Sequence, residues 1–317
     1  MELQTEFLNA VRHYAKEKGE NWLAELPVLI QHAEQKWDLD VKEPYELSIN
    51  YVAPAVKKDG IKVVVKICLP DNDGFTDELN ALREFNGKGM VKLLDWDEEK
   101  KIFLLENISP GISLANVKKD EEACRIAARV MRSLALPAPS ETSIPTIEAR
   151  KRSLEKIIVE HPEGVGPISF PVLNKAFTLF NYLLHTAGPS FVLHGDFHHF
   201  NVLLSGEEEW VAIDPKGLIG EIESDLIQFL LNCLPEDNLE VFTQKRVNIF
   251  IEALNLQEER LLQWGFCHTV LATAWSVDED GGYSEGFYGM IEVFERLMRE
   301  AGASTNKGFQ VWKNKND

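Results

Sequence analysis

The chain has 317 residues, of which 44% are apolar and 26% charged, and it contains only 20 Gly and 14 Pro. This composition excludes intrinsic disorder, collagen-like structure and low-complexity repeats, and the length favours two lobes over one compact core. The 51 acidic residues against 33 Lys and Arg give a formal charge of -18, and a field of that sign repels nucleic acid and anionic membranes while it attracts cationic ligands.

Cysteine placement and the N-terminal sequence bear on the compartment. The four cysteines form no C-x-x-C pair, which argues against structural zinc and against a disulfide framework. The first residues are acidic where a signal peptide is basic, and no stretch approaches the roughly 18 apolar residues of a membrane span. We therefore expect a soluble, cytoplasmic protein without a nucleic-acid or membrane partner.

The first hundred residues favour a helical extension followed by an antiparallel sheet. Apolar residues at helical spacing predict helices on either side of Gly19 within residues 1–40. Period-two patterns and turn residues then predict strands and one helix. The strands are expected at 45–52, 61–67, 91–95 and 102–105, with a hairpin turn at 57–60 and the helix at 76–85.

The rest of the chain favours helices around one β-rich segment. The helices are predicted at 120–136, 146–160, 170–187, 224–234, 237–254, 257–276 and 284–302. Short strands are expected at 191–193, 202–204 and 210–213. These patterns predict an α+β chain with a β-rich N-terminal lobe at 1–106, which includes the helical extension 1–40, and a helical C-terminal lobe at 107–317.

Polar chemistry is concentrated in the β-rich segment. Asp196 and Asn201 lie in the loop between two of these strands, and Asp214 follows the next strand. Catalytic groups are often carried by loops that rigid strands hold in place. Phosphoryl transfer needs a carboxylate for the hydroxyl proton and oxygen ligands for Mg²⁺. These three side chains supply that set.

The order and spacing of these residues resemble a known family. His194-Gly195-Asp196 with Asn201, followed by Ile213-Asp214-Pro215, resembles the aminoglycoside phosphotransferase branch of the protein-kinase-like superfamily. The segments 212–221 and 224–226 resemble its streptomycin and hydroxyurea kinase subgroup. The resemblance covers roughly residues 45–280. It implies a two-lobed protein-kinase-like fold that binds ATP and Mg²⁺ and phosphorylates a hydroxyl of a small molecule, streptomycin-like or related.

Carried over by position, the resemblance implies roles for the polar residues. Asp196 would be the catalytic base, Asn201 and Asp214 the Mg²⁺ ligands, and Lys66 the lysine that holds the nucleotide phosphates with Glu78 as its partner. Lys66 also stands at the end of a run of valines, where a lysine without a partner would be costly.

The resemblance also implies residues around the nucleotide and behind the catalytic loop. A nucleotide-covering hairpin without glycine would use Ser48 and Asn50, and a hinge from Glu106 to Ile108 would bind the purine edge. Asp225 would brace the catalytic loop, although an Asp at this place is equally suited to capping a helix. His194 is interpreted as a buried brace of the same loop.

Acidic residues of the C-terminal lobe are candidates for binding a cationic acceptor. Asp278, Glu279 and Asp280 follow Trp275, and Glu221 lies after the second acid of the motif. An acidic loop beside an aromatic ring suits an aminosugar or a guanidine. The same residues are also typical of a solvated surface.

Three alternatives stay open at this point. The first is a kinase for a metabolic alcohol such as choline, homoserine or a sugar. The second is a nucleotide-binding pseudoenzyme, against which the retention of the whole polar set argues. The third is a zinc hydrolase that uses His194, His198 and nearby acids, although their loop position gives no assured ligand geometry.

Overall fold

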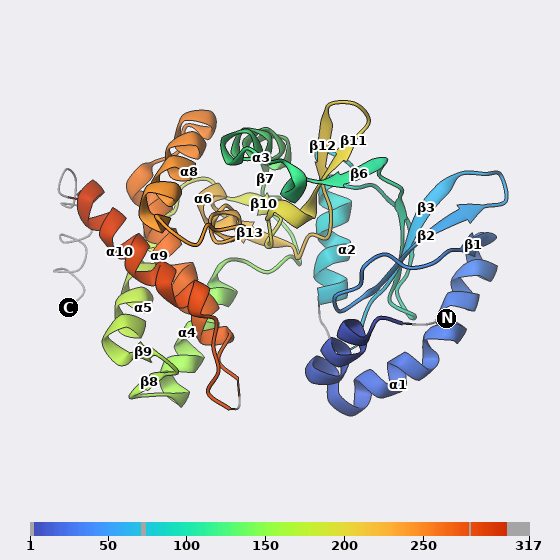
Figure 1. The fold of residues 1–317 in the computed structure, drawn as a ribbon, viewed down its shortest axis with the longest axis horizontal. Helices are drawn as coiled ribbons and strands as arrows, with labels where there is room; N and C mark the ends of the chain where they lie inside the picture. Colours follow the sequence, from blue (N-terminus) through green and yellow to red (C-terminus); the bar gives the residue numbers. More distant parts are fainter. Residues whose placement is uncertain (1–2, 71–73, 279, 303–317) are drawn as a thin grey trace.

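An antiparallel sheet between two helices forms the N-terminal part of the molecule (Figure 1). The computed structural model describes residues 3–70, 74–278 and 280–302. The sheet has the strand order β1-β2-β3-β5-β4. Its strands are β1 (Leu39–Val41), β2 (Tyr51–Lys57), β3 (Lys62–Ile67), β4 (Leu93–Asp97) and β5 (Ile102–Glu106), and its helices are α1 (Thr5–Trp37) and α2 (Gly74–Phe85).

Alternation along the strands divides the side chains between the two helices. Ile102 and Leu104 of β5 belong to the core that α1 covers, whereas Phe103 and Leu105 belong to the core that includes α2. Successive side chains of a strand point to opposite faces. The side chain of Lys66 on β3 accordingly meets Glu78 of α2 at the same face.

The helix α1 differs from the predicted pair of helices. It spans 33 residues and its break is at Lys16, which has φ 48° and ψ -127°. Gly19, the expected boundary, is buried inside the helix, where a Cβ would lie 2.7 Å from the Val11 carbonyl oxygen. Glycine at this position therefore permits close packing across the kink instead of ending a helix.

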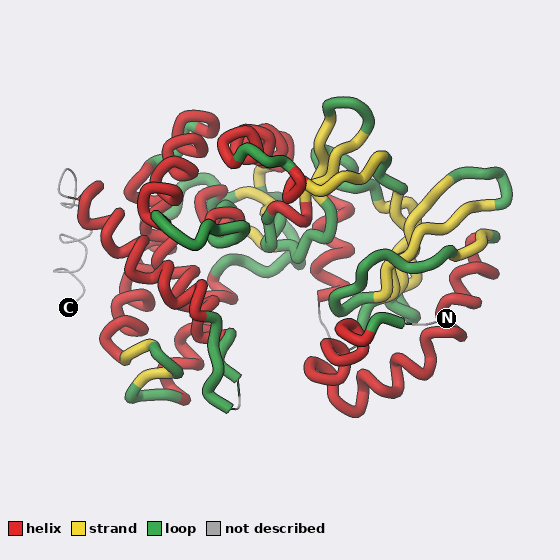
Figure 2. The backbone as a smooth tube through the Cα atoms, viewed as in Figure 1, coloured by secondary structure: helices red, strands yellow, loops and turns green. Residues whose placement is uncertain are grey.

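The C-terminal part combines short strands with long helices (Figure 2). Two three-stranded sheets have the orders β13-β10-β7 and β12-β11-β6, and β8 pairs with β9. The strands are β6 (Pro110–Ser113), β7 (Leu136–Pro137), β8 (Gly164–Val165), β9 (Ile168–Ser169), β10 (Phe191–Leu193), β11 (Val202–Ser205), β12 (Glu209–Ala212) and β13 (Leu218–Gly220). The helices are α3 (Asp120–Leu134), α4 (Glu148–Glu160), α5 (Phe170–His185), α6 (Ile222–Asp225), α7 (Ile227–Leu230), α8 (Leu239–Leu254), α9 (Glu258–Trp275) and α10 (Glu285–Gly302).

Two predicted elements are wrong. The strand expected at 45–52 begins only at Tyr51 and continues through Pro54, whose carbonyl accepts a hydrogen bond from the Lys42 N–H (2.8 Å). The helix expected at 224–234 is the short pair α6 and α7. None of the helices within the described ranges has the length and apolar character needed to span a bilayer.

Backbone contacts join the two parts next to the polar loop. The chain leaves the first sheet at Glu106 and enters the sheet of β11 at Pro110. The Val91 N–H donates to the Ala212 carbonyl (2.8 Å), and the Ala212 N–H donates to the Gly89 carbonyl (2.8 Å). These bonds fix the end of β12, and therefore Asp214, relative to the first sheet.

Candidate active site

Lys66 joins the two parts of the molecule at the predicted site. Its Nζ donates to both carboxylate oxygens of Glu78, at 2.6 and 2.7 Å, and to Asp214 Oδ1. The Lys66 and Glu78 side chains are buried, whereas that of Asp214 is one-third exposed. Asp214 also accepts a hydrogen bond from Lys216 Nζ at 3.1 Å. One carboxylate of this cluster therefore remains open to an incoming ligand.

Charge pairing keeps Lys66 and Asp214 ionised, whereas burial raises the pKa of Glu78 despite its contact with Lys66. Burial alone would lower the pKa of Lys66, but the carboxylates of Asp214 and Glu78 outweigh it and raise that pKa. Burial would likewise raise the pKa of Asp214, but Lys66 and Lys216 hold it below its usual range. At neutral pH the site thus presents ammonium groups and a carboxylate, which suit phosphate oxygens and a hard cation.

Asp225 holds the backbone of the catalytic loop, residues 194–201. Its Oδ2 accepts the His194 N–H and its Oδ1 accepts the Gly195 N–H, both at 2.7 Å. Asp225 is buried, and burial raises its pKa to about 6 while the two amides oppose the rise. The position of Asp225 therefore matches the bracing role that the resemblance implies.

His194 holds the same loop from the other side. Its Nε2–H donates to the Ile213 carbonyl (2.8 Å), and its Nδ1 accepts the Asp196 N–H (3.2 Å). Burial lowers the pKa of His194 to about 4, so the ring is neutral at pH 7. Both ring nitrogens are occupied, so His194 has no nitrogen left for zinc. Among the described residues no three His, Cys, Asp or Glu side chains are grouped to hold a metal.

The side chain of Asp196 lies half-buried beside polar neighbours. Gln228 Nε2 donates to its Oδ1 at 3.4 Å, and His198 Nε2 lies 3.8 Å from its Oδ2. Burial lowers the pKa of His198, so this imidazole is neutral at pH 7. Among the described side chains no lysine or arginine lies at ion-pair distance from the Asp196 carboxylate.

Asn201 is oriented by the loop that carries it. Its Nδ2 donates to the Asp196 carbonyl at 3.0 Å, which leaves Oδ1 without a donor among the described residues. An amide oxygen and one carboxylate, from Asn201 and Asp214, match the few protein ligands that Mg²⁺ takes when phosphates and water complete its coordination. The donor set therefore fits the predicted metal.

The four residues predicted to surround the nucleotide differ in how free their side chains are. Asn50 Oδ1 accepts the Leu69 N–H (3.1 Å), and Glu106 Oε1 accepts the Lys92 N–H (2.7 Å). These two side chains therefore use acceptor atoms to hold the backbone. Ser48 is exposed before β2, and Ile108 lies half-buried between β5 and β6.

The predicted acceptor contacts need one clear correction. Glu221 is buried and accepts hydrogen bonds from Arg260, from Trp264 Nε1 (3.0 Å) and from the Gly188 N–H (2.8 Å). These donors occupy its carboxylate, so Glu221 is a structural residue and the substrate role proposed for it is wrong.

The acidic loop after α9 is only partly available to a ligand. Asp278 Oδ1 accepts the N–H groups of Asp280 (3.0 Å) and Gly282 (2.7 Å), which fold the loop on itself. Asp280 is exposed, and Glu279 lies outside the described residues. Asp280 is therefore the described acid of this loop whose carboxylate does not hold the loop backbone.

Comparison with known proteins decides the family. The sequence profile of the aminoglycoside/hydroxyurea antibiotic resistance kinases matches residues 40–281. The chain belongs to this family. It is therefore a phosphotransferase that acts on an alcohol group, as the sequence motifs predict.

Named relatives and solved structures agree with this assignment. The kinase is 30% identical to streptomycin 6-kinase of Streptomyces griseus over 275 residues, 84% of this chain and 87% of that protein. It is 26% identical to hydroxyurea phosphotransferase of Kitasatospora aureofaciens over 286 residues, 89% of this chain and 82% of that protein.

The solved structures confirm the two-lobed protein-kinase-like fold. Choline kinase LicA of Streptococcus pneumoniae superposes with a TM-score of 0.64 at 17% identity and covers 87% of this chain and 99% of its own. A complex of aminoglycoside phosphotransferase APH(4)-Ia with ADP and hygromycin B has a TM-score of 0.59 at 12% identity and covers 85% and 97%.

Several residues of the kinase site could not be found from sequence motifs. Gln228 of α7 contacts Asp196, and Lys216 contacts Asp214. Arg150 of α4 donates to the Gly195 carbonyl. Lys216 stands two residues after Asp214, inside the segment 212–221 that resembles the family, which is a usable signal, but neither Gln228 nor Arg150 belongs to a recognisable pattern.

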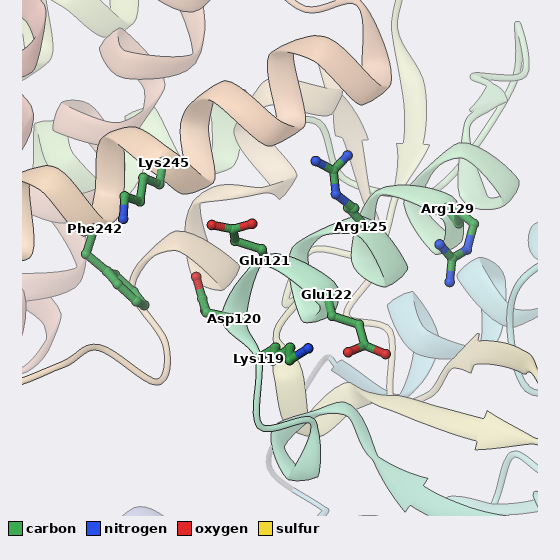
Figure 3. Close-up of a pocket in the computed structure, with 8 residues that line it drawn as sticks. All are labelled: Lys119, Asp120, Glu121, Glu122, Arg125, Arg129, Phe242 and Lys245. Atoms are coloured by element: carbon green, nitrogen blue, oxygen red, sulfur yellow. The ribbon is translucent and has the colours of Figure 1, made fainter.

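A cavity of about 770 Å³ lies between the start of α3 and α8 of this kinase (Figure 3). None of the predicted site residues lines it. It is lined by Lys119, Asp120, Glu121, Glu122, Arg125, Arg129, Phe242 and Lys245. The Asp120 carboxylate is held by the buried guanidinium of Arg246, with Nη2 2.6 Å from Oδ1. This cavity is therefore separate from the cluster around Lys66.

Proposed function

We propose that this kinase binds ATP with Mg²⁺ between β3 and the catalytic loop and transfers the γ-phosphoryl group to a hydroxyl of a small antibiotic-like molecule. One observation carries the proposal: Lys66 Nζ contacts both Glu78 and Asp214. A lysine paired with a glutamate and next to a second acid is the arrangement that nucleotide phosphates and their metal would need, which supports the proposal. Solved relatives in complex with AMP and with ADP support nucleotide binding at this fold.

The residues of the chain divide the chemistry between them. The Asp196 carboxylate accepts the proton of the acceptor hydroxyl. The oxygen of that hydroxyl bonds to the γ-phosphorus of ATP, and the bond between this phosphorus and the oxygen that leaves with ADP breaks. Lys66 holds the phosphates, and Asn201 and Asp214 would hold Mg²⁺. The metal, when bound, neutralises charge that develops on the phosphoryl oxygens.

We propose an acceptor of the streptomycin-like or hydroxyurea-like class. The support comes from the relatives, which include streptomycin 6-kinases and a hydroxyurea phosphotransferase. The formal charge of -18 also favours a cationic aminoglycoside over an anionic alcohol. The hydroxyl that is phosphorylated depends on a few side chains of the helical lobe.

A nucleotide-turnover screen tests this function. The purified chain is mixed with ATP, Mg²⁺ and one acceptor at a time, namely streptomycin, other aminoglycosides, hydroxyurea, choline and homoserine. We expect ADP release with streptomycin or hydroxyurea, a phosphorylated product by mass spectrometry and no release by Lys66→Ala. Turnover of choline or homoserine alone would contradict the acceptor class, and nucleotide binding without turnover of any acceptor would favour the pseudoenzyme.

A further inference from the structure

The peptide between Gly195 and Asp196 is held at both of its polar atoms. Its N–H, on Asp196, donates to His194 Nδ1. Its carbonyl, on Gly195, accepts Arg150 Nη2 at 2.5 Å. Since the orientation of this peptide plane sets the direction of the Asp196 side chain, Arg150 acts directly on the geometry of the proposed base.

The Arg150 guanidinium is fixed by a second, unusual partner. Its Nη1 lies 3.1 Å from Nδ1 of His268, a buried residue of α9. Burial lowers the pKa of His268 well below its usual value, so the ring stays neutral and Nδ1 accepts this hydrogen bond. Two rigid helices, α4 and α9, thus aim one guanidinium at the catalytic loop.

Charge explains why an arginine suits this place. Burial lowers the pKa of Arg150, and the carboxylates of Asp225 and Asp196 oppose that effect. Within the described residues Arg150 has no carboxylate at ion-pair distance, so its charge is balanced from farther away by Asp196 of the loop and Asp225 of α6. Even a partly buried cation without such compensation would be costly, and lysine lacks the planar fork that reaches two acceptors.

We propose that Arg150 is a positioning residue of the phosphoryl transfer, which orients the Gly195 carbonyl and, through this peptide, the Asp196 side chain. This inference rests on the proposed function for its kinetic part only. The geometric part predicts that the catalytic loop loses order when Arg150 loses its guanidinium, whatever the acceptor is.

The test compares Arg150→Gln and Arg150→Lys with Arg152→Gln. Arg152 lies on the same helix and is 63% exposed, so its replacement changes the charge equally without touching the loop. We expect faster amide hydrogen exchange in residues 192–201 for both Arg150 variants. We also expect kcat to fall about 10- to 100-fold with little change in KM for ATP.

The pH dependence separates positioning from a general loss of structure. Charged groups acting on Asp225 are Arg150 and Asp196, and the Arg150 cation opposes the rise in pKa that burial imposes on Asp225. Without that cation Asp225 takes up its proton at higher pH, so the acidic limb of kcat should move upward in Arg150→Gln. Arg152→Gln should leave the limb unchanged.

The outcomes distinguish this inference from the proposed function. Arg150 variants that match Arg152→Gln in exchange, kcat and acidic limb would overturn the inference. If the wild-type chain phosphorylates no acceptor, the proposed function fails, and the exchange of residues 192–201 still decides the role of Arg150. If Arg150→Gln does not fold, Arg150→Lys is used instead. It keeps the positive charge and removes the planar guanidinium, so its amide exchange and kcat show which of the two properties orients the loop.

Discussion

Asp196 stands apart from the cations of the site, which permits a test of its role alone. Its neighbours are the Gln228 amide and the neutral His198 ring, whereas Lys66 contacts Glu78 and Asp214. Replacing Asp196 with Ala should therefore lower kcat by about 10²- to 10⁴-fold and leave ATP affinity nearly unchanged. Steady-state kinetics and calorimetric ATP titration check both halves, and an unchanged kcat would refute the assignment.

The buried His194 ring predicts a dependence of stability on pH. Its pKa is about 4 when folded and 6.5 when unfolded. As pH falls from 6.5 towards 4, the unfolded chain binds a proton that folded His194 does not, so the folded state loses about 2–3 kcal/mol from this residue. At pH 7 the ring is neutral in both states and this loss is absent.

His194→Gln isolates that contribution, because an amide does not titrate in this range. Urea unfolding at pH 7 and pH 4.5 should show the stability advantage of the wild type shrinking at the lower pH. An advantage that stays constant between the two pH values would show that His194 is protonated in the folded protein.

At the residue scale, motifs predict some contacts and miss others for a physical reason. The ion pair of Lys66 with Glu78 is present as expected, because both residues stand in elements of a recognisable order. The substrate role predicted for Glu221 is wrong because Arg260, its ion-pair partner, lies 39 residues away in the sequence and no motif joins the two. Arg150 and Gln228 reach the loop from helices whose packing no local pattern specifies.

At the element scale, the loop after Asp214 packs against α2, and this contact is testable. Gly217 has φ +70°, and a Cβ there would lie 2.7 Å from the Asp77 carbonyl oxygen of α2. Gly206 has nearly the same φ, +73°, with open space around it. An alanine at either position would therefore suffer the same backbone strain from the positive φ. Only an alanine at position 217 would also bring its Cβ into a clash with α2.

We expect Gly206→Ala to cost about 1–2 kcal/mol of stability and Gly217→Ala to cost about 1–3 kcal/mol more. Because the clash displaces α2 from the loop of Asp214, Gly217→Ala should also raise KM for ATP, whereas Gly206→Ala should not. Chemical denaturation and steady-state kinetics measure the two effects, and equal behaviour of the variants would argue against coupling of α2 to Asp214.

The long elements could be predicted because their own periodicity specifies them. The helices α3, α5, α8, α9 and α10 begin and end within two residues of the expected bounds. Strands β6, β7 and β13 were missed, since they have two to four residues and form only by pairing with β10 or β11. Their hydrogen-bond partners lie far away in the sequence.

At the scale of the whole molecule, the α+β two-lobed fold could be predicted because ordered motifs are spread over most of the chain. The surroundings of the acceptor could not be predicted in the same way. They depend on side chains of the helical lobe that come from separate elements and belong to no shared sequence motif.

The charge of the whole chain leads to a prediction about acceptor binding. A cationic acceptor gains from the field of a chain with a formal charge of -18, whereas neutral hydroxyurea does not. The Debye length falls from about 10 Å at 0.1 M salt to about 3 Å at 1 M. KM for a cationic acceptor should therefore rise with salt at nearly constant kcat, and KM for hydroxyurea should not.

A substitution at Asp280 separates the effect of one exposed carboxylate of the acidic loop from the effect of the net charge of the whole chain. It is exposed, whereas Asp278 holds its own loop and is better left intact. If the acidic loop meets the acceptor as the sequence predicts, Asp280→Asn should raise KM for a cationic acceptor at low salt and reduce its salt dependence, because that carboxylate is lost. Glu98→Gln, an equal charge change in the exposed turn before β5, is the matched control and should have little effect. If KM for a cationic acceptor changes neither with salt nor with Asp280→Asn, the acidic loop is a solvated surface. Recognition of the acceptor then depends on other side chains of the helical lobe.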